Sequence, residues 1–285
     1  MRLGGGKDWC FGRRRGGSGS FCGSGRYEKR GNEMGERIET KKFSLELTSC
    51  ALHFMAMAFM LSDHLWATVI PWKADWMTIV GRLAFPIFAF MIVEGFFHTK
   101  NLKKYVLRML IFALISEIPF NLMMSGSFIY PFHQNVLWSF LLGLFLMNLN
   151  EKAKKKGKLW IRILVGIGTF LLGTLLGLLS MMDYMQYGIW MILAFYFLRG
   201  RKWWNYVGQF AALAYINYAV RGLSYEWNLF GTTVWFPQQC FAVLALIPIW
   251  LYRGKQGPHN KVLQYIYYAF YPVHILILGL IVRFL

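Results

Sequence analysis

The stretch LWIRILVGIGTFLLGTLLGLLSM, residues 159–181, decides the fold class of this chain. It carries a single charge, near its start, and it is long enough for a helix that crosses the hydrocarbon core of a bilayer, which needs about 20 residues. The preceding stretch, EKAKKKGK at 151–158, is rich in lysine. Thr169, Gly173 and Gly177 form a stripe of small residues, a pattern that lets membrane helices approach closely. The sequence here predicts a membrane-spanning helix with a basic joint before it.

The composition of the whole chain agrees with a membrane protein. Of 285 residues, 56% are hydrophobic and only 15% are charged, whereas soluble domains carry about 25% charged residues. The formal net charge of +18 comes from 31 Lys and Arg against 13 Asp and Glu. In a membrane protein this excess is typical of cytoplasmic loops, so no nucleic-acid partner is expected. The four cysteines lack the spacing of a metal site or a disulfide scaffold, and no metal is expected.

Apolar stretches alternate with polar joints from residue 43 onward. We expect an all-α, polytopic transmembrane helix bundle of about nine spans, within a range of eight to ten, in a single domain covering 43–285. The fourth, sixth and eighth stretches are short for a full crossing, and one of them is a candidate re-entrant segment. The expected spans cover about 50–70, 77–98, 104–124, 135–150, 159–181, 186–199, 204–220, 236–252 and 263–284.

The charge of the joints alternates along the chain. By the positive-inside rule, this alternation predicts a multi-pass protein of the cytoplasmic (inner) cell membrane, with the N-terminus in the cytoplasm and the C-terminus outside. The joints rich in Lys and Arg are 98–104, 151–158, 199–203 and 253–262. The joints 71–76, 125–134, 182–185 and 221–236 contain only Lys73 and Arg221 as basic residues.

Residues 1–42 differ from the remainder of the chain. They are rich in Gly, Arg and Ser, and they have too little apolar surface to offset the entropy of ordering. We expect a disordered basic tail. The alternatives are a contact with RNA or a lipid surface, and an extension upstream of a later start at Met34.

Ionisable residues of three expected spans lie at one depth. At 1.5 Å of rise per residue, Asp63, His64, Arg82 and Glu117 would lie about 7–11 Å below the outer surface. Charges inside a membrane persist by pairing or by lining water, so a structural bridge from Arg82 to a carboxylate and a solvated functional cavity both stay open. Adjacent helical residues point about 100° apart, so Glu117 is a better orienter for His64 than Asp63 is.

More polar residues are expected close to this layer. Two are in the joint before the sixth span, three are in and beside the joint after the third span, and one is near the middle of the last span. A lone histidine on an apolar helix is usually a packing residue, but several that converge on an acidic layer favour function. The candidate acceptor-site residues are His133, Gln134, Asn135, Asp183, Tyr184 and His274.

A second polar group is expected at the cytoplasmic ends of the helices. Glu94 and His98 are four residues apart and share a helix face. A capped helix end with ordinary positive-inside lysines explains the group, and so does a docking patch for a phosphorylated donor. The donor-site candidates are Glu94, His98, Lys100, Lys103, Lys104 and Arg108. Neither group contains HExxH, GxSxG or a phosphate-binding glycine loop, so a transporter and a membrane enzyme both stay open.

Several blocks, taken in order from about residue 43 to the C-terminus, resemble the TraX family. They are MLSDHLW (60–66), GRLAFPIFAF (81–90), EGFFHT (94–99), ISEIPF (115–120), HQNV (133–136), Asp183-Tyr184 with Gly188, and YPVH (271–274). The family is named for a conjugal-transfer protein that acetylates the N-terminus of F-type pilin. It is similar to the wider group of multi-pass acyltransferases, in which a histidine near the first span is the suspected catalytic residue. By position, His64 matches that histidine.

The resemblance implies an acyl-CoA-dependent N- or O-acyltransferase, with acetyl-CoA as the donor substrate and a pilin-like protein or a cell-surface glycan as the acceptor. His64 would take the proton of the acceptor amine or hydroxyl, supported by Glu117 or Asp63, and Arg82 or Asn135 would stabilise the oxyanion. The alternatives are a proton-coupled transporter, with Asp63, Glu117 and His64 as a relay, and a non-catalytic assembly factor for a surface structure.

Overall fold

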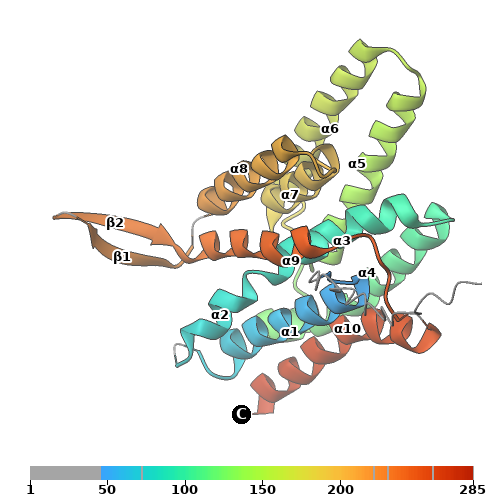
Figure 1. Ribbon diagram of the computed structural model, residues 1–285. Coiled ribbons are helices and arrows are strands. Elements are labelled where there is room, and N and C mark those ends of the chain that lie inside the picture. Colours follow the sequence, from blue (N-terminus) through green and yellow to red (C-terminus); the bar gives the residue numbers. More distant parts are fainter. Residues whose placement is uncertain (1–45, 72, 221, 230, 259, 285) are drawn as a thin grey trace, which may run out of the picture. The chain divides into compact units, whose positions relative to one another are not determined.

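The computed structural model describes residues 46–71, 73–220, 222–229, 231–258 and 260–284. The basic tail expected at 1–42 lies outside these residues. The described part is mostly helical, and its elements in chain order are α1 (Ser49–Thr68), α2 (Asp75–Gly81), α3 (Ala84–His98), α4 (Leu102–Ser125), α5 (Leu137–Lys155), α6 (Leu159–Leu179), α7 (Met185–Phe197), α8 (Trp203–Val220), β1 (Ser224–Leu229), β2 (Thr232–Pro237), a 3₁₀-helix η1 (Gln238–Ala245), α9 (Leu246–Leu251) and α10 (Lys261–Phe284) (Figure 1).

Each expected span coincides with helical structure in this order of elements. Four segments are long and apolar enough to cross a membrane by length and composition. They are Asp75–His98, Leu102–Ser125, Leu159–Leu179 and Lys261–Phe284. Two shorter apolar segments, Met185–Phe197 and Gln238–Leu251, accompany them. The chain is therefore a membrane protein built from many helices.

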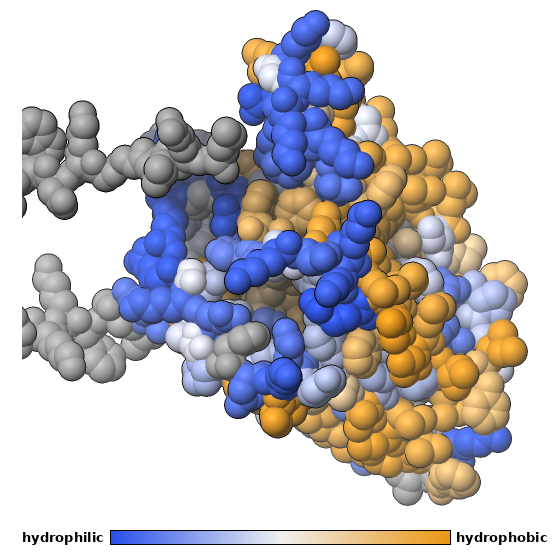
Figure 2. Space-filling model, turned by 90° about the vertical axis from the view of Figure 1, so that its right-hand side faces the viewer, coloured by the Kyte–Doolittle hydropathy of each residue, from blue (hydrophilic) through white to orange (hydrophobic). Residues whose placement is uncertain are grey.

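The joints lie at alternate ends of the helices. In Figure 1 the turns from α3 to α4 and from α5 to α6 lie on the right, whereas the turn from α1 to α2 and the β1–β2 hairpin lie on the left. Figure 2 shows the right-hand face, where hydrophilic residues gather beside a broad hydrophobic surface. The basic joints thus share one end of the molecule, as the charge pattern predicts.

The second expected span is not one continuous helix. The helix ends at Gly81 and begins again at Ala84. Pro86 explains this break, because it has no N–H to bond the carbonyl of Arg82 and its ring crowds that carbonyl. Arg82 and Leu83 keep right-handed helical dihedral angles across this break, and the N–H of Arg82 still donates to the Thr78 carbonyl.

The stretch 221–252 also differs from the prediction. Part of the expected outer joint forms an antiparallel hairpin, in which Ser224 pairs with Pro237 and Leu229 with Thr232. Gly231, with φ 80°, supplies the turn conformation that L-residues rarely adopt. The eighth expected span is a 3₁₀-helix followed by a short α-helix, and Pro248 near this junction cannot bond the carbonyl of Leu244. The all-α prediction was therefore wrong for the hairpin.

The small-residue stripe of α6 is confirmed as a packing surface. The buried residues of this helix are Thr169, Gly173 and Gly177. A Cβ on Gly173 would lie 2.7 Å from the Ile189 side chain of α7, and a Cβ on Gly177 would lie 2.7 Å from the Gln186 backbone. Contact that close requires glycine, and it leaves the apolar remainder of α6 exposed for lipid.

The two candidate sites lie around α1 and α10. Helix α10 packs along α4 and also contacts α1, while α1 contacts α2 and α3. Buried residues of these helices, including Leu52, Ile87 and Ile275, belong to the main hydrophobic core. These helices therefore pack around a shared apolar core.

Candidate functional site

A polar cluster lies near the C-terminal end of α1, around His64. Its first part is the ion pair of Asp63 with Arg82. Nη2 of Arg82 lies 2.5 Å from Oδ1 of Asp63 and donates to Oγ1 of Thr78 at 2.9 Å. The Thr78 hydroxyl donates to the same Asp63 oxygen at 2.7 Å. A Cβ on Gly81 would lie 2.3 Å from the Cβ of Asp63, so this glycine permits the close approach of α1 and α2. The structural bridge expected for Arg82 is present.

The Arg82 cluster continues into the 3₁₀-helix. Nη1 of Arg82 donates to Oε1 of Gln239 at 3.3 Å, and Gln239 donates to Oδ1 of the buried Asn217 at 3.1 Å. Tyr184 stacks on Phe85 with ring centroids 3.9 Å apart. Sequence reasoning missed Gln239 and Asn217, since only the three-dimensional packing brings α8 and η1 to the Arg82 side chain. Arg82 is thus held by side chains from several elements.

His64 pairs with His274 of α10. Nδ1 of His64 lies 2.8 Å from Nε2 of His274, and the two rings stack with centroids 5.0 Å apart and 9° between their planes. Nδ1 of His274 lies 2.7 Å from the carbonyl oxygen of Phe270. Glu117, the predicted orienter of His64, does not make this contact. The histidine near the middle of the last span does so instead.

The backbone carbonyl assigns the tautomers of the neutral pair. A carbonyl can only accept, so Nδ1 of His274 carries a hydrogen and its Nε2 carries a lone pair. That lone pair must accept from His64, so Nδ1 of His64 also carries a hydrogen. Nε2 of His64 is then the nitrogen with a lone pair, and no hydrogen bond joins it to another described residue. This arrangement provides a proton acceptor whose other nitrogen is fixed by a hydrogen bond.

Glu117, which is partly buried, and Asn135 form a separate group. Oε2 of Glu117 accepts from the indole N–H of Trp138 at 3.0 Å and from the Asn135 amide. That amide also donates to the carbonyl of Ala113 at 2.9 Å, and its oxygen accepts from the N–H of Leu137 at 3.1 Å. Asn135 is fully buried. Both amide hydrogens are donated to protein acceptors in this conformation, so the oxyanion-donor role of Asn135 stays a prediction.

A contact between His133 and Asp183 connects the α4–α5 segment to the α6–α7 segment. Nε2 of His133 lies 3.3 Å from Oδ1 of Asp183, and this hydrogen bond, assisted by the Asp183 and Glu117 charges, raises the pKa of His133 despite its partial burial. Gln134 uses its backbone to pair with the segment just before Asp183 and its side chain to bond the Pro131 carbonyl at 2.8 Å. The candidate acceptor residues of these joints are therefore held together.

The backbone around Asp183 and Tyr184 is strained. Met181 has φ 50° and Met185 has φ 44°, the left-handed region that non-glycine residues seldom occupy. Such strain is found where a fold over-determines a local conformation, often at functional sites.

The charges of Asp63, Asp183 and Arg82 act on His64. We call Asp63, His64, Arg82, Glu117, Asp183 and His274 the histidine layer.

At the other end of α1 lies a cavity of about 470 Å³, here called the Glu94 cavity. Its lining includes three of the six donor-site candidates, Glu94, His98 and Arg108. Arg199, which sequence reasoning missed, holds Glu94 with Nε 2.7 Å from Oε1 and Nη2 3.3 Å from Oε2. Nε of Arg108 donates to the Tyr268 hydroxyl at 3.3 Å. A carboxylate, an imidazole and a guanidinium thus face one space.

The remaining donor-site candidates lie outside the cavity wall. Lys100, Lys103 and Lys104 are exposed residues around the start of α4, and they are absent from the cavity lining. The side chain of Asn101 caps this helix by accepting from the N–H of Lys104 at 3.0 Å. The structure therefore separates the six predicted residues into a cavity group and a surrounding basic rim.

An apolar chamber lies between the Glu94 cavity and the histidine layer. It has a volume of about 130 Å³ and shares the lining residues His53 and Tyr267 with the Glu94 cavity. His53 and Tyr267 stack with centroids 4.3 Å apart. At its far end the chamber is lined by Phe270, which stacks on His274 with centroids 4.5 Å apart. The chamber therefore adjoins the Glu94 cavity directly, whereas the Phe270 ring separates it from His274, which does not line it.

His53 is the clearest functional candidate that sequence reasoning missed. The signal was available, because eleven residues make about three full turns of an α-helix and so place His53 and His64 on one face, about 16 Å apart along the axis. Met57 and Met60 lie between them on that face, and both line the chamber.

Among the described residues, no cluster of three or more His, Cys, Asp or Glu side chains could hold a metal ion.

These features define the class as a polytopic membrane protein with a partly buried pair of histidines at one end, a polar cavity at the other and an apolar chamber between them. The particular family is shown by the sequence. Residues 49–282 match the family described as TraX protein, and the chain belongs to this family. The resemblance drawn from the residue blocks is thereby confirmed.

One curated relative is similar over most of both chains. It is described as "Probable fimbrial assembly protein FimC, serogroup H1" from Dichelobacter nodosus, and it is 28% identical over 254 residues, which cover 82% of this chain and 96% of that protein. No solved structure matches the chain.

Proposed function

We propose that this protein is an integral membrane acyltransferase that moves an acyl group, in the simplest case acetyl, from cytosolic acyl-CoA to an acceptor outside the cytoplasm. The observation that carries the proposal is the pair of hydrogen bonds that runs from His64 through His274 to the Phe270 carbonyl. It leaves Nε2 of His64 with a lone pair inside a cluster of charges. The orientation that fits is cytoplasmic for the Glu94 cavity and extracytoplasmic for the histidine layer.

The proposed step uses His64 as a general base. An acceptor amine or hydroxyl attacks the thioester carbonyl, its proton passes to Nε2 of His64, and the C–S bond breaks to release the coenzyme A thiolate, which takes a proton. The imidazolium formed at His64 keeps its hydrogen bond to His274 and lies near the carboxylates of Asp63 and Asp183. Arg82 is the cation of the layer that can stabilise the oxyanion electrostatically.

The opposite end suits the donor. The Glu94 cavity carries Arg108 and is surrounded by the exposed lysines of the α3–α4 joint, and phosphates of coenzyme A favour such basic surroundings. The apolar chamber suits an acyl group rather than an ion, because its wall is formed mainly by Met, Phe and Tyr side chains. This arrangement favours extension of the thioester end of acyl-CoA along α1 and α10 toward His64, with the C–S bond intact until the acceptor attacks.

The family and the relative support a pilus-related acceptor. The TraX family is associated with pilin acetylation, and the relative's description names fimbrial assembly. A pilin-like protein is therefore the acceptor we favour, and a cell-surface glycan is the second choice. The cytoplasmic (inner) membrane is the location at which cytosolic acyl-CoA and an exported acceptor meet.

The relative's description favours a second candidate function, a non-catalytic assembly factor for a surface structure. Such a protein would keep the helices and their packing but would not need the lone pair of His64. A proton-coupled transporter is the third candidate, and the histidine pair could serve its relay. The apolar chamber between the polar sites argues against this third candidate, since an ion or proton path needs polar groups or water along its length.

Substitution His64→Gln tests the proposal. Intact masses of surface proteins would be compared between cells that carry the wild-type gene and cells that carry the variant. Loss of a general base lowers such a rate by about 10²–10⁴-fold, so the acetyl mass increment on the acceptor should disappear. Purified variant protein should still bind acetyl-CoA, because the Glu94 cavity is untouched.

The matched control is Thr68→Ala, which lies one turn from His64 on α1. It removes the 2.6 Å hydrogen bond from the threonine hydroxyl to the His64 carbonyl and leaves the imidazole in place. Acetylation should persist in the control. If the His64→Gln cells acetylate normally while pilus assembly stays intact, the enzymatic proposal is wrong. If acetylation persists but assembly fails, the assembly-factor function is favoured.

A further inference from the structure

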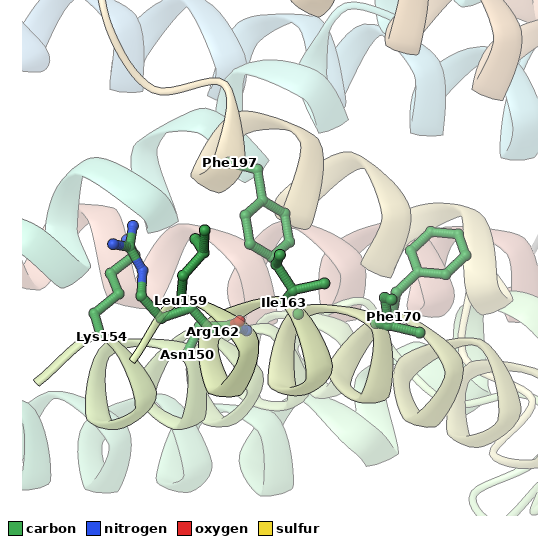
Figure 3. Close-up of a pocket in the computed structure, with 9 residues that line it drawn as sticks. Asn150, Lys154, Leu159, Arg162, Ile163, Phe170 and Phe197 are labelled. Atoms are coloured by element: carbon green, nitrogen blue, oxygen red, sulfur yellow. The ribbon is translucent and has the colours of Figure 1, made fainter. Parts of the chain in front are cut away.

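A groove between α5, α6 and the end of α7 belongs to neither polar site. It has a volume of about 460 Å³. Figure 3 shows its basic side chains, Lys154 and Arg162, at one end, and the ring of Phe170 at the other. Leu159, Ile163 and Phe197 line the space along its length. The groove therefore has a cationic head and an apolar tail.

The two cations of the groove differ in how they are satisfied. Nζ of Lys154 lies 2.7 Å from Oε1 of Glu151 and 4.5 Å from the centre of the Tyr196 ring, and the Tyr196 hydroxyl donates to the same Glu151 oxygen. Arg162 is exposed, and no carboxylate of the described chain lies within ion-pair distance of it. An unpaired guanidinium at the end of an apolar groove attracts an anion.

The surroundings of the groove face lipid. Helix α6 is one of the four segments apolar enough to cross a membrane, and its side chains beside the groove are more than half exposed, as with Ile163 at 53% and Ile167 at 55%. Gly166 lines the groove without a side chain that would occupy it. A Cβ there would lie 3.7 Å from Phe197 and 3.9 Å from Asn150, which is ordinary contact distance. Arg162 lies within the first turn of α6, directly after the lysine-rich joint. A cation in the first turn of an apolar helix is typical of the headgroup region of a leaflet.

We propose that the groove binds an anionic phospholipid. The phosphate of the lipid pairs with Arg162, with Lys154 close by, and one acyl chain lies along Ile163, Ile167 and Phe170. Charge complementarity selects an anionic over a zwitterionic headgroup, and basic pockets between membrane helices bind such headgroups in general. The inference does not depend on the acyltransferase function, because it uses neither the histidine layer nor the Glu94 cavity.

Lipid titration followed by native mass spectrometry of the full chain tests this proposal. The probes are phosphatidylglycerol and phosphatidylcholine with the same acyl chains. We expect one phosphatidylglycerol to bind in preference to phosphatidylcholine, and Arg162→Gln to weaken that binding about fivefold. Gly166→Leu keeps both cations but fills the groove, so it should also weaken binding. Arg283→Gln removes a cation of α10, far from the groove in the sequence, and should leave binding unchanged.

Several outcomes would overturn the assignment. Equal binding of the two lipids would do so, as would an unchanged affinity in Arg162→Gln with an unchanged melting temperature. Glycerol 3-phosphate that displaces the lipid at matched concentration would show that the site recognises a free phosphate. A dimer that Gly166→Leu dissociates, without any lipid preference, would instead assign the groove to a second copy of the chain.

Discussion

The histidine layer and the Glu94 cavity lie at opposite ends of α1, and they treat their polar groups differently. In the histidine layer, Asp63 and Arg82 satisfy each other and two histidines share one hydrogen bond. Around the Glu94 cavity, polar side chains line about 470 Å³ of open space. A fixed set of donors and acceptors suits chemistry, because catalytic groups must be held in one geometry. A roomy basic cavity suits binding of a large, charged substrate.

The largest expected effect on stability comes from breaking the ion pair of the histidine layer. Asp63→Ala leaves Arg82 without its carboxylate in a place where each side chain is no more than 24% exposed. We expect a loss of about 3 kcal/mol in the free energy of unfolding, because a charge left unpaired at depth is costly. Equilibrium unfolding of the wild type and of Asp63→Ala in mixed micelles would measure this difference in free energy.

The double variant Asp63→Ala with Arg82→Gln sharpens this prediction. Removing both charges should cost less than the sum of the two single changes, because neither charge is then left alone. Additive losses would show that the two side chains do not depend on each other, and the bridge would then contribute nothing specific to the layer.

The next largest effect concerns the close approach of α1 and α2. Gly81→Ala places a Cβ 2.3 Å from the Cβ of Asp63, so the helices must separate. We expect a destabilisation of about 2 kcal/mol, typical of overpacking. The matched control is Gly168→Ala on α6, where a Cβ meets nothing within 4 Å, and it should be neutral or stabilising by about 0.5 kcal/mol. Equal effects of both changes in thermal unfolding would contradict the predicted packing.

The sequence was sufficient for the helices, the membrane class and the alternation of the joints, because hydropathy and charge act locally. The small-residue stripe on α6 was also predictable, since its spacing follows from helix geometry. The break at Arg82 could have been predicted from Pro86, but the ion pair of Arg82 with Asp63 could not. That ion pair depends on the close approach of α1 and α2 at Gly81 and on the position of Asp63 on another helix.

Partners far apart in the chain could not be read from the sequence. His64 and His274 were both candidates, yet 210 residues separate them, and Glu117 was the expected partner on grounds of depth alone. Depth fixes one coordinate, whereas the partner depends on which faces of α1, α4 and α10 meet. The hairpin was missed for a related reason, because short strands with aromatic residues resemble an interfacial loop in hydropathy.

The third prediction tests whether the two ends act separately. Arg108→Gln removes the cation of the Glu94 cavity wall, and we expect the dissociation constant for acetyl-CoA to rise about tenfold from loss of a charge-assisted contact. Lys104→Gln, an exposed cation on the same helix outside the lining, should change it by less than about twofold. Isothermal titration in nanodiscs would measure both. Equal effects would mean that the surrounding field, rather than the cavity, holds the donor.

The smallest expected effect is the pH dependence of the His133–Asp183 contact, which ties two joints beside the histidine layer. The hydrogen bond to Asp183 raises the pKa of His133, so the folded state binds the proton more tightly than the unfolded state does. The stabilisation is therefore complete below the unfolded pKa of about 6.5 and is lost as pH rises through the raised value of the folded state.

Thermal unfolding of the wild type and of His133→Gln across this range measures the contact. Both side chains are about one-third exposed, at 29% and 32%, so the wild type should be more stable by only about 0.5 kcal/mol near pH 6 and by nothing above the folded pKa. A difference that grows with rising pH would show the opposite sign and would contradict a protonated His133 stabilised by Asp183. Asp183→Asn should lose the same pH-dependent increment, because the proton on His133 is stabilised chiefly by that carboxylate.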